Sequence, residues 1–202
     1  WDISSRSIPK KTRTINGHSL SVTSLLFDQN NDILISSSRD GTVMLWDVAK
    51  PKTYMELGDI EFPEDDITTG MAFKPNSNFL TSWNSDGKFV VWDISDLANP
   101  KKTETLDGSI KDAVFSRDGK LMASSSDKDN IVTLWDATDF AKLNTIKIDN
   151  DSVNAIELSK DGKTLAIIGK KIILWDVTDP KKPAQLSILP QQDDEMADMV
   201  FN

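Results

Sequence analysis

The sequence has no cysteine and only one histidine, His18. The lack of cysteine excludes disulfides and thiolate metal sites, and it favours a compartment where oxidation is not exploited, so we expect a cytoplasmic protein. The sequence also lacks a Gly-x-Ser-x-Gly nucleophile elbow and a phosphate-binding glycine loop. These absences argue against most enzyme classes.

Basic residues are in deficit, with 23 Lys and Arg against 32 Asp and Glu and a formal net charge of -9. Binding to a phosphate backbone depends on Lys and Arg that displace counterions, so nucleic acid and anionic membranes are not expected partners. Long hydrophobic runs are missing too. The longest, such as residues 172–175, are strand-sized and far below the ~20 residues that span a bilayer.

A repeat organises the 202 residues, of which 38% are hydrophobic. The dipeptide Trp-Asp falls at residues 1–2, 46–47, 92–93, 135–136 and 175–176, at spacings of 45, 46, 43 and 40. Five of the six tryptophans occupy this one position. A fixed period in this range indicates a repeat architecture.

Each repeat contains short β-branched and apolar runs separated by turn residues. In the first complete repeat they are residues 22–27, 33–38 and 42–46, with the turn Arg39-Asp40-Gly41 before the last. Such runs predict strands, and Asp-Gly predicts a hairpin. The same order recurs at 110–115, 121–126 and 131–135, and at 153–158, 165–168 and 172–175. A fourth strand is predicted after each Trp-Asp, at 53–57, 103–106, 143–148 and 184–188.

Four-stranded units of about forty residues that end in Leu-Trp-Asp resemble the WD40-repeat β-propeller family over essentially all of residues 1–202. The resemblance implies one all-β domain of radial, four-stranded antiparallel blades, with the first strand of each blade at a central channel. Four complete repeats and partial blades at both ends make an incomplete propeller, about four to five blades of a seven-bladed ring.

The two ends of the sequence fall within blades. Trp1-Asp2 is the tail of a third strand, and residues 196–201 have the pattern of an inner strand. We therefore expect a fragment of a longer propeller, completed by on the order of 100 further residues or by another chain. Open end blades would expose apolar faces and strand edges that favour association.

The resemblance implies a hydrogen-bonded tetrad of His18, Ser36, Asp40 and Trp46. His18 follows a glycine at the family position, and Asp40 lies six residues before Trp46. A chain from Trp46 through Ser36 and His18 to Asp40 satisfies four buried polar groups at once. The alternative is a serine triad or proton shuttle at His18. We favour the structural role because buried polar networks mostly specify a fold.

The other repeats depart from this pattern. Asp86 and Asp129 stand six residues before their tryptophans with no histidine, and Gly169 replaces the aspartate in the fourth repeat. We expect incomplete tetrads there, and a fourth repeat that depends on apolar packing and is the softest.

The predicted ligand contacts are Arg39, Ser85 and Lys128, the residues that precede the three turn aspartates. A buried turn aspartate would fix each hairpin and hold its neighbour outward on a stiff support.

Three further features have structural and functional interpretations. The acidic triplets 64–66 and 193–195 lack the spacing of a Ca²⁺ loop and indicate solvated loops, so no metal or cofactor is predicted. Pro-Lys segments such as 100–102 and 180–183 would block edge pairing, or else offer rim sites for phosphate. Trp83, outside the Trp-Asp register, would fill the core between blades or anchor a partner.

The function predicted from the sequence is a non-catalytic interaction or sensor platform for a protein or peptide. Two alternatives stay open: a propeller enzyme that uses carboxylates near the channel, and a purely structural assembly subunit.

Overall fold

The computed structural model describes residues 10–11, 14–28, 32–49, 55–61, 68–106, 108–126, 128–149, 152–189 and 201. Trp1-Asp2, both acidic triplets and residues 196–200 of the predicted last strand lie outside this set. The described residues form sixteen strands. They include no helix that is long and apolar enough to cross a membrane.

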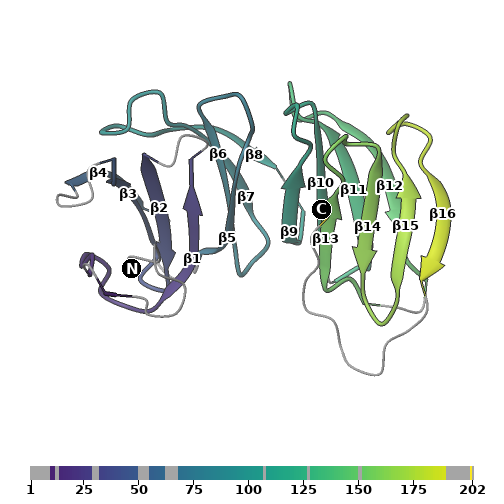
Figure 1. Cartoon of the computed structure of the whole chain (residues 1–202), viewed down its shortest axis with the longest axis horizontal. Coiled ribbons are helices and arrows are strands. Elements are labelled where there is room, and N and C mark those ends of the chain that lie inside the picture. The colour runs from purple at the N-terminus through teal and green to yellow at the C-terminus, as the bar shows by residue number, and fades with distance from the viewer. Residues whose placement is uncertain are drawn as a thin grey trace.

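The strands form four sheets, each with four antiparallel strands in chain order (Figure 1). We call the sheets blades 1 to 4. Blade 1 contains β1 (Val22–Phe27), β2 (Ile33–Ser38), β3 (Thr42–Asp47) and β4 (Met55–Glu61). Blade 2 contains β5 (Thr68–Phe73), β6 (Phe79–Asn84), β7 (Phe89–Asp93) and β8 (Lys101–Leu106). Blade 3 contains β9 (Ile110–Phe115), β10 (Leu121–Ser126), β11 (Ile131–Asp136) and β12 (Lys142–Lys147). Blade 4 contains β13 (Ala155–Leu158), β14 (Thr164–Ile168), β15 (Ile172–Asp176) and β16 (Ala184–Leu189).

Strand order confirms the predicted blades, with differences of a few residues at some strand ends. β4 is described over Met55–Glu61 and extends beyond the predicted end at residue 57, and residues 53–54 lie outside the described set. β13 begins at Ala155 and not at residue 153, because its partner strand β14 ends at Ile168, which pairs with Ala155. Strand ends are therefore set by the length of the neighbouring strand.

The blades form an open arc. Inner strand β1 packs beside β5, β5 beside β9, and β9 beside β13. No comparable contact joins β13 to β1 within the described residues. The fold is an incomplete propeller, as the sequence predicted.

Hydrogen bonds from side chains link successive blades. Thr23 Oγ1 of blade 1 donates to Thr68 O of blade 2 at 2.8 Å, and Trp83 Nε1 of blade 2 donates to Lys111 O of blade 3 at 2.9 Å. Lys111 Nζ in turn donates to Val153 O, just before β13, at 3.2 Å. These bonds fix the stagger between blades near the central axis.

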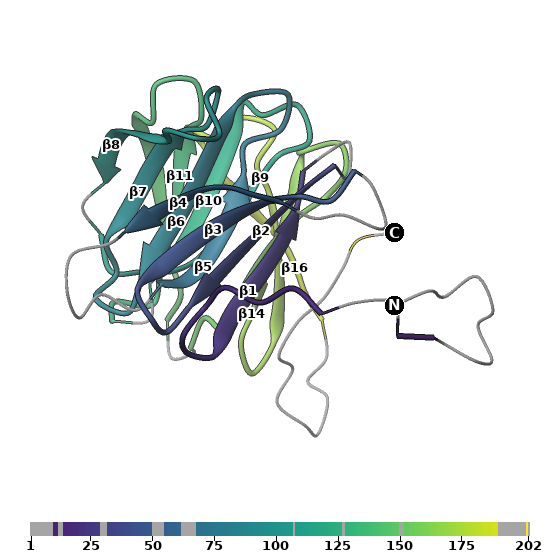
Figure 2. The same cartoon turned by 90° about the vertical axis from the view of Figure 1, so that its left-hand side faces the viewer.

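The hydrophobic core is divided among the junctions between blades. Trp92 of blade 2 joins the cluster that contains Leu45 of blade 1. Trp135 of blade 3 joins the cluster of Phe89 in blade 2, and Trp175 packs against the cluster of blades 3 and 4. The repeat tryptophan of a blade therefore faces the preceding blade. Blade 1, which has no preceding blade among the described residues, lies in front in Figure 2.

Trp83 fills the junction between blades 2 and 3. Its side chain is only 4% exposed, and its ring stacks on Phe89 with centroids 6.0 Å apart and planes 8° apart. Gly70 lies opposite it in β5, and a Cβ atom there would lie 2.2 Å from the indole. The structure thus agrees with the core-filling interpretation, and the alternative of an exposed aromatic anchor is wrong.

The aspartate of each Trp-Asp pair within the described residues has a local role that the repeat pattern does not predict. Its Oδ1 accepts the backbone N–H two residues later at 2.9–3.0 Å, which closes the turn after the third strand. The side-chain hydroxyls of Ser95 and Thr138, followed by the backbone bonds, lower the pKa of two of these carboxyls, and in the third the backbone bond from Thr178 is the larger cause of the lowered pKa. The four aspartates are Asp47, Asp93, Asp136 and Asp176.

Candidate functional site

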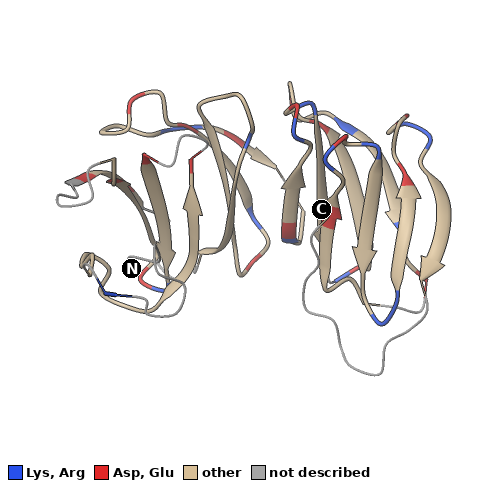
Figure 3. Cartoon of the chain, viewed as in Figure 1, with Lys and Arg blue, Asp and Glu red and all other residues tan. Residues whose placement is uncertain are grey.

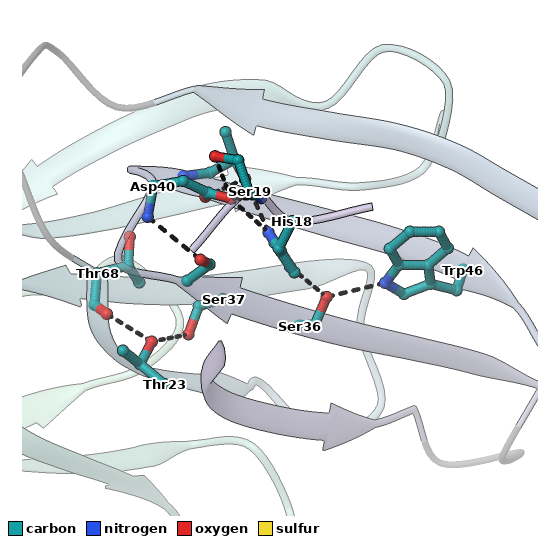
Figure 4. A network of polar contacts seen from close by, with 10 residues as sticks. His18, Ser19, Thr23, Ser36, Ser37, Asp40, Trp46 and Thr68 are labelled. Carbon is teal, nitrogen blue, oxygen red and sulfur yellow. Dashed lines mark hydrogen bonds and ion pairs between the residues drawn. The ribbon is translucent and has the colours of Figure 1, made fainter. Parts of the chain in front are cut away.

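The four predicted tetrad residues contact one another in blade 1 (Figure 4). Trp46 Nε1 donates to Ser36 Oγ at 2.8 Å, and Ser36 Oγ lies 2.7 Å from His18 Nε2. His18 Nδ1 lies 3.2 Å from Asp40 Oδ2. The His18 and Asp40 side chains are 6% and 8% exposed. The contacts run in the predicted order, from the indole to the carboxylate.

One arrangement of protons satisfies the whole network. Ser36 accepts from the indole and donates to Nε2, while the imidazole carries its proton on Nδ1 and donates to Asp40. Thr42 Oγ1 lies 3.0 Å from Nδ1 as well. Both ring nitrogens are engaged, and the Ser36 hydroxyl is enclosed between two rings. This geometry has no free base and no exposed nucleophile, which supports a structural role.

Asp40 receives several hydrogen bonds besides the one from His18. Ser19 N donates to Oδ2 at 2.7 Å, and Thr42 donates to Oδ1 from its backbone N at 3.0 Å and its hydroxyl at 2.6 Å. Burial alone would raise the pKa of Asp40. The hydrogen bonds from Thr42 and Ser19, and to a smaller extent the charge of His18, outweigh burial and hold this pKa well below its ordinary value. The carboxylate therefore stays ionised at neutral pH.

Two other blades keep half of this network. Trp92 Nε1 donates to Ser82 Oγ, and Trp135 Nε1 donates to Ser124 Oγ, both at 2.9 Å. In blade 4 the corresponding position is Ile167, which is opposite Ile173 as Ser36 is opposite Met44. Accordingly, Trp175 Nε1 is buried without a partner among the described residues. The sequence carried a sign of this, since a serine at that position is replaced by isoleucine.

The turn aspartates of blades 2 and 3 differ from the prediction. Asp86 and Asp129 are both exposed, so the premise that a buried aspartate fixes each hairpin is wrong outside blade 1. In blade 2 the hairpin is held by Asn84, whose Oδ1 accepts Lys88 N at 2.8 Å and whose carbonyl accepts Gly87 N at 3.0 Å. A carboxylate is buried only where enough donors surround it.

The predicted contact residues Arg39, Ser85 and Lys128 are all exposed. They lie at the turns between the second and third strands, and we call the surface formed by residues 39–41, 85–88 and 128–130 the turn face. Ser85 and Lys128 line one cavity of about 290 Å³ at the junction of blades 2 and 3. Arg39 is not part of its lining. The structure thus brings together two of the three predicted residues.

Among the described residues, Lys and Arg are scattered together with Asp and Glu over strand ends and loops (Figure 3). Within the part of the chain that the structure describes, no group of three or more His, Asp and Glu side chains could hold a metal ion.

A family model described as "WD domain, G-beta repeat" matches residues 9–47, 60–93 and 100–136, more than half of the chain. The chain belongs to the WD40 family. The matched segments cover the repeats whose tryptophan has a serine partner, and they stop before the fourth repeat. A comparison with curated protein sequences gives no significant match.

Among solved structures, the WD40 chain is similar to the β-propeller domain of Cps50 (Swd1) from Myceliophteria thermophila, with a TM-score of 0.73 and 16% identity. The alignment covers 88% of this chain and 60% of that chain. At this identity the similarity shows the fold alone. Because 1390 solved chains match, the fold by itself does not specify a partner.

Proposed function

We propose that this WD40 chain is a non-catalytic interaction or sensor platform in the cytoplasm, and that a protein or peptide partner binds its turn face. The observation that carries the proposal is the cavity between blades 2 and 3, where the exposed residues Ser85 and Lys128 lie together on hairpins held by buried strands. A rigid scaffold that presents varied side chains on loops suits recognition. Its only histidine is occupied in the blade 1 network, which supports a non-catalytic role.

The turn face can be tested by combined substitution of Arg39, Ser85 and Lys128 with alanine. All three are exposed, so we expect an unchanged melting temperature and at least a tenfold loss of partner in affinity capture from native lysate, quantified by mass spectrometry. The matched control is Lys101→Ala with Lys102→Ala, at the outer rim of blade 2. Capture that survives the triple change but fails in the rim control would move the site to the outer edge.

We also propose that further propeller structure, from additional residues or another chain, covers the open face of blade 1. Leu25 and Phe27 of β1 are 62% and 53% exposed, and Leu20 and Val22 beside them are 59% and 50% exposed. In blades 2 to 4 the corresponding face packs on the preceding blade. An exposed apolar patch of this kind marks an interface.

If this proposal holds, the isolated 202-residue chain should associate through blade 1, with a mass above 22.5 kDa by light scattering and native mass spectrometry. Leu25→Lys combined with Phe27→Lys should restore the monomer, because both side chains are exposed and the change does not disturb the core. A wild-type chain that stays a stable 22.5 kDa monomer at high concentration would contradict the proposal.

A further inference from the structure

Four buried polar atoms at the turn-face ends of blades 2 and 3 have no hydrogen-bond partner among the described residues. They are Thr68 Oγ1, Asn84 Nδ2, Ser125 Oγ and Ser126 Oγ. Thr68 and Asn84 are opposite each other in β5 and β6, and Ser126 is opposite Ile110 at the start of β9. Most buried polar atoms of folded proteins have partners, so this concentration near one junction calls for an explanation.

Blade 1 satisfies the positions equivalent to Asn84, Ser125 and Ser126, and has the apolar Val22 where blade 2 has Thr68. Ser37 Oγ lies 2.9 Å from Thr23 Oγ1, and Ser38 Oγ accepts the backbone N of Asp40 at 3.2 Å. Thr23 stands at an irregularity in the pairing of the inner strand, and Lys111 stands at the same place in blade 3. The Lys111 ammonium reaches Val153 O of the next blade, and no side-chain partner is left for Ser125. Buried side-chain atoms of blades 2 and 3 thus lack hydrogen-bond partners at positions where blade 1 supplies them.

Of the four residues with unpaired atoms, Asn84 lines the cavity at this junction, and Thr68, Ser125 and Ser126 do not. Asn84 is only 1% exposed, and its Oδ1 is fixed by the backbone N of Lys88, so Nδ2 is the atom left to donate. Lys128 brings an ammonium group and Ser109 brings a hydroxyl, whereas the Lys111 ammonium is engaged by Val153 O. The turn of blade 2 is held against the start of blade 3 because Ile110 N donates to Gly87 O at 3.1 Å. The donors therefore lie at a junction that a backbone hydrogen bond between the two blades holds in place.

We propose that this cavity binds the carboxylate of an Asp or Glu side chain from a peptide partner, with Asn84 Nδ2 and the Lys128 ammonium as its donors. The inference rests on the proposed function, since it names the chemistry recognised at the turn face. A carboxylate supplies acceptors to a buried unpaired amide and to an ammonium, and such charge-assisted hydrogen bonds are the strong ones. The exposed carboxylate of Asp86 at the same cavity disfavours ligands of higher negative charge, such as phosphate.

The test uses the full chain and two small probes that differ in one group, N-acetylglutamate N-methylamide and N-acetylglutamine N-methylamide. In ¹H–¹⁵N NMR titrations, the glutamate probe should shift the side-chain amide of Asn84 and the backbone amides of Gly87 and Ser109. The glutamine probe should bind at least tenfold more weakly, because it lacks the charge.

Asn84→Asp is the decisive variant. It keeps the oxygen that accepts Lys88 N, so the hairpin is retained, but it replaces the donor Nδ2 by a second acceptor. Binding of the glutamate probe should weaken at least tenfold in Asn84→Asp, and severalfold in Lys128→Ala. Lys102→Ala, an exposed cation on outer strand β8, should bind as the wild type does.

The outcomes separate the two proposals. Equal binding of both probes, or full binding by Asn84→Asp in a folded spectrum, overturns the carboxylate site. Shifts that map elsewhere on the turn face, with partner capture still lost in the triple alanine variant, overturn the cavity but leave the interaction face. Loss of both probe binding and turn-face-dependent capture overturns both.

Discussion

Trp83→Ala is expected to lower the free energy of unfolding by about 3–5 kcal/mol, the usual cost of truncating a buried aromatic side chain to alanine. The indole is 4% exposed, stacks on Phe89, and donates to Lys111 O of the next blade. The substitution removes contacts in two blades and leaves a cavity at their junction. Urea unfolding followed by circular dichroism measures the change.

Two variants divide this effect into its parts. Trp83→Phe keeps an aromatic ring beside Phe89 but loses the bond to Lys111 O, so the loss should be smaller than for alanine. Gly70→Ala introduces a Cβ that would lie 2.2 Å from the indole, and overpacking of this kind costs about 1–3 kcal/mol. A loss below about 1 kcal/mol for Trp83→Ala would mean that the ring is not a core element.

The position of Trp83 shows what the repeat pattern could and could not predict. The Trp-Asp register gives the strands and the blades, because the same alternation recurs in each unit. It does not say whether an off-register tryptophan faces solvent or the next blade. That depends on Gly70, which leaves space for the ring across the strand pair.

A closer comparison of the repeats would have predicted that the turn aspartates of blades 1 and 2 differ in burial. In blade 1 the sequence Asp40-Gly41-Thr42 supplies a hydroxyl donor to the carboxylate, while Asp86 is followed two residues later by Lys88. Blade 2 has no counterpart of Thr42 or His18 to offset the cost of desolvating a carboxylate, and Asp86 is accordingly exposed. Spacing to the tryptophan alone was therefore an insufficient guide.

The cavity between blades 2 and 3 could not be predicted from one repeat. Its lining comes from the hairpin at Asn84, the start of β9 at Ser109 and the hairpin at Lys128. These segments meet only because of the stagger between blades, which Trp83 Nε1 and Ile110 N fix through bonds across the junction. The sequence predicts Ser85 and Lys128 as contact residues at equivalent turns, and the fold places them at the same cavity.

His18→Ala is expected to lower the free energy of unfolding by about 1–3 kcal/mol, because it leaves the Ser36 hydroxyl and the Asp40 carboxylate short of a partner in a buried site. Partner capture at permissive temperature should not change, since the ring is enclosed. The matched control is Asp86→Ala, the exposed counterpart of Asp40 in blade 2, which should stay within about 0.5 kcal/mol of wild type.

The pH dependence of stability gives an independent check on the same network. The folded pKa of Asp40 is lowered below its ordinary 3.8, so its contribution to stability is complete above that pH and is lost as the pH falls below it. His18→Ala removes one of the groups that lower this pKa, so the loss of stability between neutral pH and the acid range should be smaller than in wild type. Thermal unfolding measured from pH 7 to pH 2 would show it. If His18→Ala instead left the melting temperature unchanged and abolished partner capture, His18 would be a binding residue and the structural interpretation would be wrong.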